Sequence, residues 1–458
     1  MRINMKYQTV IDFLMQEIVD KKLRTGSKLP SILELSKKLE CNKSTVTRAY
    51  AEMEKEHAVY SVPKSGYYLV SKKEQLTGTP ETQCIDFCPH IYSSKVVTDI
   101  ELKHCLNQSI SLYGDKMLTA DDVSGGIESL RKAIQKQLQN LQVFTSADNL
   151  FVTTGTQQSL SVLINTPLPN GNTKILVEQP ACPEILNALE ACGAETVGIE
   201  RGVDGIDFEK LENIFKTGEI KFFYTMPRLH NPTGFSYSTE QKKRILKLAR
   251  QYNVYVVEDD CFAELDLIKK SDPIFSEDSS STVFYLKSYS KILFPWLRLG
   301  IIVFPSDLSD LFKGKKICSD IIEQGALEFF IKNGMYDKHI KRIKKIYQTR
   351  MNVLKNACGR YLGTGMSTLI PNTGCYACIG LPENIPTHLL ARSLEARNVK
   401  ITTADNAYLP PCRKSNCICL NIRDVDESQI EQGIKIISEE LEKITEGRTA
   451  DLAEFKWK

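Results

Sequence analysis

Ser288-Tyr289-Ser290-Lys291, with Arg298 seven residues further on, is the stretch of sequence that decides the fold of the larger part of this chain. A lysine amine with a lowered pKa is the group that forms a Schiff base with an aldehyde. Arg298 can clamp a phosphate through two parallel hydrogen bonds. Lys291 alone could equally be one of many surface lysines, so the other polar segments of the chain decide its role.

Three further polar segments precede this lysine. Thr153-Thr154-Gly155-Thr156-Gln157-Gln158 follows a short strand and opens a helix, where backbone amides and hydroxyls could cradle a phosphate. His230-Asn231-Pro232-Thr233-Gly234 is a polar turn whose asparagine amide could donate to a phenolate oxygen. Val256-Val257-Glu258-Asp259-Asp260 ends a buried strand in carboxylates. A carboxylate there could keep a pyridine nitrogen protonated, so that the ring acts as an electron sink.

Apolar runs of strand length alternate with helical segments from Ile85 onward. This alternation predicts a mostly parallel sheet covered by helices on both faces, which is the α/β class. The chain of 458 residues is too long for one ordinary core, so we expect several domains. We predict a small domain over residues 1–71, a polar linker over 72–84 and a large domain over 85–458. The runs that suggest strands are Lys174–Val177, Lys221–Tyr224, Val254–Val257 and Gly300–Phe304.

The first seventy residues predict three helices and a hairpin, which together make a winged helix-turn-helix. Tyr7 to Val19 carries an apolar stripe of helical period, and Ser31 with Glu34 has the spacing of a capping box. A third helix is expected from Asn42 to about Lys55, followed by two short strands around a Pro/Gly turn. This segment holds twelve lysines and arginines against eight aspartates and glutamates, whereas the whole chain has a net charge of only +3. A basic head on a nearly neutral body is consistent with nucleic-acid binding.

The polar first turn of the third helix is where a recognition helix would meet base edges and phosphates. Lys64, at the tip of the hairpin, could contact a further phosphate. A winged helix used only for protein contacts is the alternative. The residues that we expect to contact double-stranded DNA are Ser31, Lys43, Ser44, Thr45, Thr47, Arg48, Lys64 and Gly66.

Two resemblances follow from these motifs. Gly26–Ser31, Asn42–Val46, Ala49-Tyr50 and Ser65–Tyr67 resemble the GntR family of bacterial regulators, although Leu33 stands where many members have a DNA-contacting arginine. The polar segments from Thr153 to Arg298 together resemble fold-type I enzymes of the aminotransferase class I/II family, which use pyridoxal 5′-phosphate (PLP), over roughly residues 86–445. The combination is similar to the MocR subfamily of regulators. That resemblance implies a domain-swapped homodimer in which PLP, or a product of PLP with a small amine or amino acid, alters DNA binding.

The second resemblance implies a role for each matching residue. Lys291 would be the Schiff-base lysine, and hence the catalytic residue. Asp259 would pair with the ring nitrogen of PLP, and Asn231 with its ring hydroxyl. The residues implied to hold the phosphate are Gly155, Thr156, Gln157, Ser288, Ser290 and Arg298.

Three positions depart from the aminotransferase pattern, and all three hold cysteine. Cys182 stands where an aromatic ring usually stacks on PLP, and Cys261 or Phe262 where a tyrosine hydroxyl is usual. Cys419 stands where an arginine usually grips the substrate carboxylate, with Arg423 nearby. Loss of a charge-assisted pair of about 1.5–3 kcal/mol predicts poor transamination. Cys182, Cys261 and Cys419 would line an effector pocket, either as sensing thiols or simply as small hydrophobic side chains.

The fourteen cysteines suggest a reduced, cytoplasmic protein, because their spacing is not that of a secreted disulfide scaffold. No apolar run is long enough for a membrane span. We predict no metal site, because Cys375 and Cys378 should point to opposite faces of a strand, and because Cys412, Cys417 and Cys419 lack histidine partners. The leading interpretation is a PLP-binding transcription regulator with little or no transaminase activity. The alternatives are an active aminotransferase with an accessory DNA-binding head, and a structural relic that has lost PLP.

Overall fold

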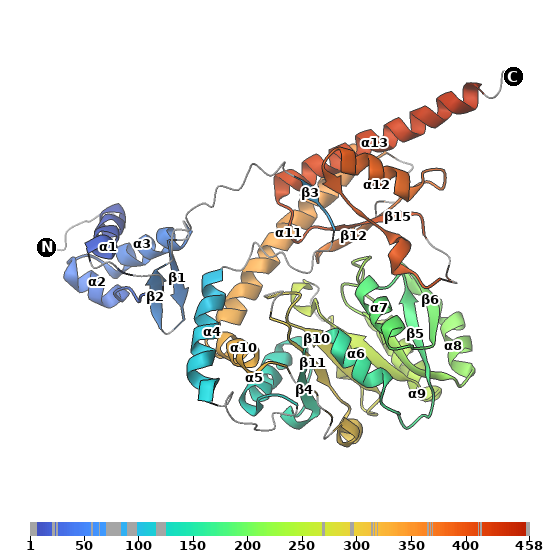
Figure 1. The fold of residues 1–458 in the computed structure, drawn as a ribbon, viewed down its shortest axis with the longest axis horizontal. Coiled ribbons are helices and arrows are strands. Elements are labelled where there is room, and N and C mark those ends of the chain that lie inside the picture. The colour runs from blue at the N-terminus through green and yellow to red at the C-terminus, as the bar shows by residue number, and fades with distance from the viewer. Residues whose placement is uncertain are drawn as a thin grey trace.

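The computed structural model contains an N-terminal head and a large α/β body, as the sequence predicted (Figure 1). The head lies at one side of the molecule, and the C-terminal helix projects from the opposite side. The structure describes residues 7–454 except 21–22, 24–25, 56–57, 64, 70–83, 89–98, 116–124, 268–270, 294–296, 313–314, 316, 318, 364–365, 367, 369, 411 and 413–414. The predicted linker therefore lies outside the described residues apart from Cys84, and the domain boundaries stay predictions.

The head consists of α1 (Tyr7–Asp20), α2 (Ile32–Lys38), α3 (Lys43–Lys55) and the antiparallel hairpin of β1 (Val59–Val62) and β2 (Gly66–Leu69). Its own core explains why these short helices form, because each contributes buried apolar side chains to one cluster. Ser31 accepts from the backbone amide of Glu34, and Glu34 accepts from that of Ser31, so the predicted capping box is confirmed. Tyr50 and Tyr67 stack at 4.0 Å between ring centroids, which fixes the hairpin against α3.

An eight-stranded sheet forms the centre of the body, in the order β4-β11-β10-β9-β8-β5-β6-β7. The five strands β10, β9, β8, β5 and β6 run parallel, which confirms the prediction from the apolar runs. The edge strands β4 and β7, and β11 beside β4, pair antiparallel. The strand bounds are β4 (Leu150–Thr153), β5 (Lys174–Gln179), β6 (Thr196–Gly202), β7 (Gly205–Ile206), β8 (Ile220–Thr225), β9 (Tyr255–Asp259), β10 (Val283–Ser288) and β11 (Gly300–Val303).

Helices cover this sheet, and every residue of its strands β8 and β10 is buried. Burial on both faces explains why these strands are runs of apolar residues rather than alternating sequences. The helices of this part are α5 (Glu128–Leu138), α6 (Thr156–Ile164), α7 (Pro183–Ala191), α8 (Phe208–Lys216), α9 (Thr239–Gln251), α4 (Asp99–Tyr113) and α10 (Ile321–Lys332).

A smaller unit, formed mostly by later parts of the chain, packs beside the large sheet (Figure 1). It contains a three-stranded sheet in the order β12-β15-β14, and β3 pairs with β13 in parallel. The long helix α11 joins it to the rest of the body and contacts α13. Its elements are β3 (Ile85–Asp86), α11 (Met335–Tyr361), β12 (Tyr376–Gly380), α12 (Thr387–Ala396), β13 (Val399–Lys400), β14 (Thr402–Thr403), β15 (Cys417–Asn421) and α13 (Glu427–Glu454).

Candidate functional site

One cavity of about 250 Å³ lies where the two parts of the body meet. It opens beyond the carboxyl ends of the parallel strands β5, β8, β9 and β10, the edge at which open α/β sheets bind ligands. All nine residues that the sequence assigned to a cofactor line this cavity, although they come from four separate segments. They are Gly155, Thr156, Gln157, Asn231, Asp259, Ser288, Ser290, Lys291 and Arg298.

The amino end of α6 forms one end of the cavity. Gly155 caps this helix with a φ of 119°, a conformation that favours glycine. Gly300 must also lack a side chain, because a Cβ there would lie 2.7 Å from the Cα of Gly155. Arg298 extends to the same place, since its Nη2 would lie 3.9 Å from a Cβ on Gly155. Unpaired helix amides, close-packed glycines and a guanidinium make a setting that fits a phosphate.

Two side chains assigned to the phosphate are engaged elsewhere. The hydroxyl of Ser290 donates to the carbonyl of Leu297 at 2.7 Å and accepts from the amide of Leu299 at 3.1 Å. The side-chain amide of Gln157 donates to the carbonyl of Glu184 at 3.3 Å. Ser290 therefore shapes the loop between Lys291 and Arg298, and its hydroxyl proton is not directed at the cavity.

Asp259 lies at the end of β9 and is buried. The hydroxyl of Tyr224 donates to its Oδ2 at 2.6 Å, and the amide of Cys261 donates to its Oδ1 at 3.2 Å. Burial raises the pKa of Asp259, although hydrogen bonds from the side chains of Tyr224 and Cys261 oppose that rise. A buried carboxylate that borders a cavity and is aligned by two donors fits a protonated ring nitrogen as its partner. Asn231 faces the same cavity and donates to Cys182 Sγ at 3.3 Å.

The pKa of Lys291 is raised, which contradicts the expectation of a lowered one. Desolvation alone would lower the pKa of this amine, but the neighbouring Cys182 and Glu184 outweigh that effect, and Glu184 is the one that carries a full charge. Glu184 Oε1 lies 3.6 Å from Lys291 Nζ. The sequence argument considered only the residues next to Lys291, and these do not include the carboxylate that determines its protonation.

Glu184 is the functional residue that the sequence analysis missed. It belongs to the first turn of α7, where an acidic residue is ordinarily explained by the helix dipole. Here its carboxylate lines the cavity and accepts from the Cys182 thiol at 2.7 Å. Burial raises the pKa of Glu184, but Lys291 more than compensates, so that its pKa is lowered. The sequence signal that could have identified Glu184 is its position two residues after Cys182, shortly beyond the end of β5.

Cys182 and Cys261 line the cavity, but Cys419 does not. The prediction that all three cysteines line one effector pocket is therefore wrong for Cys419. Cys419 lies on β15 and borders a smaller neighbouring cavity instead. Burial raises the pKa of both Cys182 and Cys261. Because the thiolate is the reactive form, these two buried thiols are poor candidates for redox sensing.

Arg423 supplies the cavity with a guanidinium, a group that the cysteine at position 419 does not have. It follows the end of β15, lines the same cavity as Lys291, and its Nη1 donates to the Lys291 carbonyl at 3.4 Å. The sequence left open whether Arg423 shares a face with position 419, and the structure shows that Arg423 lines the cavity. Strand alternation did not decide the matter, because Arg423 lies beyond the strand.

The exposed amino-terminal part of α3 carries most of the candidate DNA contacts. Lys43, Ser44, Thr47 and Arg48 are exposed, while Thr45 is half-buried. The hydroxyl of Thr47 donates to the carbonyl of Lys43, and the guanidinium of Arg48 lies 4.6 Å from the ring centroid of Tyr7.

Three other residues from the DNA-binding prediction lie around the hairpin and α2. The hydroxyl of Ser31 caps α2, and Gly66 begins β2 with a φ of 123°. Lys64 lies outside the described residues. Leu33, which stands where an arginine was expected, is 49% exposed, so an apolar side chain is available on this surface.

The head contacts the body through its hairpin and α3. Lys338, in the first turn of α11, lies 2.7 Å from the carboxylate of Glu54 and donates to Ser61 at 2.6 Å. Beside this pair, the rings of Tyr60 and Tyr68 pack against His104 of α4. The head is thus joined to the element that borders Lys291, because His339, the next residue of α11, hydrogen-bonds the carbonyl of Ile292 at 2.7 Å.

The fold and the site define a transcription regulator with a DNA-binding head and an aminotransferase-type body. The chain belongs to the aminotransferase class I and II family, matched over residues 122–437, and its head matches the gntR family of bacterial regulatory proteins over residues 6–69. An uncharacterized HTH-type transcriptional regulator of Bacillus subtilis, YcxD, is 38% identical over 95% of this chain and 100% of its own length.

Aminotransferases also resemble this chain. Aromatic-amino-acid aminotransferase 1 of Thermococcus litoralis is 30% identical over 69% of this chain and 78% of its own length. A kynurenine aminotransferase of Pyrococcus horikoshii, solved with pyridoxamine phosphate, superposes with a TM-score of 0.70 at 25% identity, over 79% of this chain and 91% of that one. Among the described residues, no helix combines the length and apolarity that a membrane crossing needs.

Proposed function

We propose that this regulator binds PLP at Lys291 and that PLP, or an amine that reacts with it, controls how the head binds DNA. The observation that carries this proposal is the convergence of all nine sequence-assigned residues on one cavity, in a chain with a gntR-type head. In a protein that had lost PLP, no requirement for cofactor binding would keep these nine residues in one cavity. When bound, PLP supplies an electrophilic aldehyde and a ring that accepts electrons.

Each residue's proposed role follows from its place in the cavity. Lys291 would hold the aldehyde through its amine, Asp259 would keep a proton on the ring nitrogen, and Asn231 would donate to the ring hydroxyl. Gly155, Thr156, Ser288 and Arg298, which line the cavity near the amino end of α6, would hold the phosphate. Ser290 acts indirectly, by fixing the loop through its two backbone hydrogen bonds.

The effector that fits the remaining space is a small amine or amino acid. Glu184 offers a carboxylate to an ammonium group, and Arg423 offers a guanidinium to a carboxylate. Both lie in the cavity that contains Lys291. An aliphatic amine would use Glu184 alone, whereas an amino acid would use both.

The start of α11 supports a physical link between this cavity and the head. His339 holds the carbonyl of Ile292, which follows Lys291, and Lys338 holds Glu54 and Ser61 of the head. A displacement of the Lys291 loop would therefore act on a helix that also contacts the winged helix. We propose further that the protein works as a domain-swapped homodimer in the cytoplasm.

A second candidate function is transamination, and Arg423 is the observation that favours it. A guanidinium in the cavity restores a partner for a substrate carboxylate, although from a different position than expected. Single-turnover absorption spectroscopy with a panel of amino acids separates the two functions. The regulator proposal expects slow or no conversion of the bound PLP to pyridoxamine phosphate, and rapid conversion would establish the enzyme.

The direct test of regulation is DNA binding with and without PLP. Fluorescence anisotropy with the DNA upstream of the gene for this chain should show an affinity that changes when PLP is added. Lys291→Ala should bind the same DNA with an affinity that does not respond to PLP. An identical response in the variant, or none in the wild type, would refute the proposal.

A further inference from the structure

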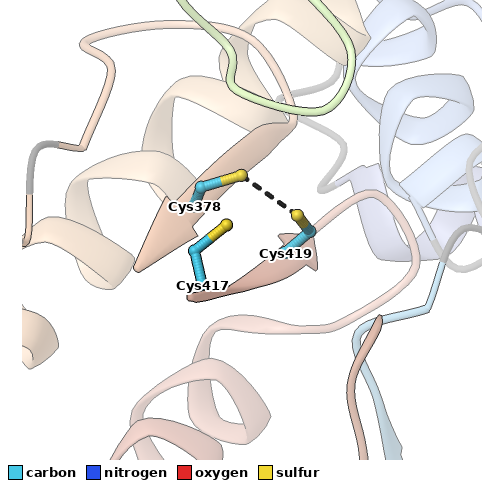
Figure 2. Close-up of side chains that lie close together, drawn as sticks. All are labelled: Cys378, Cys417 and Cys419. Carbon is cyan, nitrogen blue, oxygen red and sulfur yellow. Dashed lines mark hydrogen bonds between the residues drawn. The ribbon is translucent and has the colours of Figure 1, made fainter. Parts of the chain in front are cut away.

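Three cysteines lie together on one face of the small sheet, outside the cofactor cavity. Cys378 on β12 is directly opposite Cys419 on β15, and Cys417 lies two residues before Cys419 on the same strand. Residues two apart on a strand share a face, so the antiparallel register brings all three thiols to one side. Their Sγ atoms all lie within 4.8 Å of one another, and those of Cys378 and Cys419 are 3.1 Å apart (Figure 2).

The prediction of no metal site grouped the cysteines differently. It weighed Cys375 with Cys378, and Cys412 with Cys417 and Cys419, but not Cys378 together with Cys417 and Cys419. The true neighbours of Cys378 are about forty residues away in sequence and become adjacent only through strand pairing. Among the described residues, Cys378, Cys417 and Cys419 are the group of cysteine, histidine or acidic side chains whose ligand atoms lie close enough together to hold a metal ion.

The donor atoms of the three-cysteine cluster are all sulfur. No imidazole or carboxylate belongs to the group among the described residues, and Ala404, Ala407 and Tyr408 pack around it. Cys417 and Cys419 are buried, whereas Cys378 is half-exposed. Three sulfur donors in a mostly apolar setting select soft cations over Mg²⁺ or Ca²⁺, which require oxygen ligands.

The geometry needs little adjustment to hold such an ion. A Zn–S bond is about 2.3 Å long, so three sulfurs around one ion lie roughly 3.8–4.0 Å apart. The Cys378–Cys419 separation of 3.1 Å and the upper limit of 4.8 Å for all three pairs each differ from that value by about an ångström or less. Small side-chain rotations on a fixed strand pair supply this change.

We propose that Cys378, Cys417 and Cys419 bind one soft, thiophilic metal ion of the Zn²⁺ or Cu⁺ class through their three sulfur atoms. Each thiol that ligates the ion releases its proton to solvent, and no oxidant or reductant is involved. The half-exposed Cys378 gives the ion a route to the site. Its thiol also donates to the Pro232 carbonyl at 3.4 Å, so the metal site adjoins the turn that carries Asn231.

The test uses the reduced full-length protein and competition between the protein and a coloured chelator, first for Zn²⁺ and then for Cu⁺. The wild type should bind one equivalent of at least one of these ions, and Cys417→Ser should bind it about a hundredfold or more weakly, because even outer-sphere changes cost ten- to a hundredfold. Cys412→Ser is the matched control, since Cys412 packs against the same cluster but lies outside the metal group. Equal affinity in Cys417→Ser, or no binding of either ion by the wild type, would overturn the proposal.

A second measurement does not depend on the folding of a variant. The wild-type protein is alkylated with and without the bound ion, and the modified cysteines are identified by mass spectrometry. The ion should protect Cys378 from alkylation while leaving Cys412 as reactive as before; both are half-exposed in the metal-free structure. Equal alkylation of Cys378 in both conditions would contradict the proposed ligands.

Discussion

Replacement of Glu184 by glutamine should lower the pKa of Lys291 and speed its reaction with PLP. Glu184 Oε1 lies 3.6 Å from Lys291 Nζ, and Gln can still accept the hydrogen bond from Cys182. At that distance a unit charge pair is worth about 1 kcal/mol with the dielectric constant of water and about 5 kcal/mol with an effective value of 20. One pKa unit corresponds to about 1.4 kcal/mol, so the expected fall is roughly one to three units.

The rate should rise rather than fall because only the neutral form of the Lys291 amine reacts with an aldehyde. The pKa of Lys291 is raised, so the amine is protonated at neutral pH and only its small neutral fraction attacks an aldehyde. Each unit by which the pKa falls increases this fraction about tenfold while the pKa stays above the working pH. The rate of PLP binding at pH 8 should therefore rise about tenfold or more in Glu184→Gln.

Stopped-flow absorbance with the PLP-free protein measures this rate from pH 7 to pH 10. The wild-type rate should climb with pH over the whole range, and the curve for Glu184→Gln should be displaced to lower pH. Glu190→Gln provides the control, because Glu190 belongs to the same helix but is exposed. If the two curves for wild type and Glu184→Gln coincide, Glu184 does not control the amine and the electrostatic reasoning is wrong.

Three other changes test the phosphate end, the core and the head. Gly300→Ala places a Cβ 2.7 Å from the Gly155 Cα and should cost about 1–3 kcal/mol of strain, which a PLP titration should register as an affinity loss of about tenfold or more. Glu178→Ala leaves Arg201, now 2.9 Å from that carboxylate, buried without its partner, and should lower the free energy of unfolding in urea by about 3–5 kcal/mol. Lys43→Ala should weaken DNA binding and reduce the slope of log affinity against log salt concentration by about one.

Matched variants distinguish these effects from general damage. A Cβ at Gly359 would have no heavy atom within 4 Å apart from its own stretch of α11, so Gly359→Ala should leave PLP affinity unchanged. Lys37→Ala removes an exposed lysine near the carboxyl end of α2 and should leave the salt dependence as in the wild type. Unchanged PLP affinity in Gly300→Ala, unchanged stability in Glu178→Ala or an unchanged salt slope in Lys43→Ala would each contradict its prediction.

The sequence predicted the features that depend on neighbouring residues. The helices of the head follow from apolar stripes and the Ser31 capping box, which act within a few residues. Asn231, Asp259 and Lys291 could be assigned because each lies in a polar segment directly beyond a buried strand. Parallel strands bring such segments to one edge, which explains why these residues meet in a single cavity.

The features that were missed depend on distant parts of the chain. Cys378 and Cys419 are paired by a strand register that no local pattern specifies. Arg423 reaches the cavity because the chain turns after β15, beyond the range where strand alternation applies. The pKa of Lys291 was expected to be lowered because only its neighbours in sequence were considered, and Glu184 comes from a different strand–helix turn.

The central claim is that one particular amine of this DNA-binding regulator captures PLP. The full-length protein should be incubated with PLP, reduced with borohydride, digested and mapped by mass spectrometry. We predict one phosphopyridoxyl group per chain on the peptide that contains Lys291, and none on that peptide in Lys291→Ala. No labelled peptide, or label spread over surface lysines with none at position 291, would contradict the account.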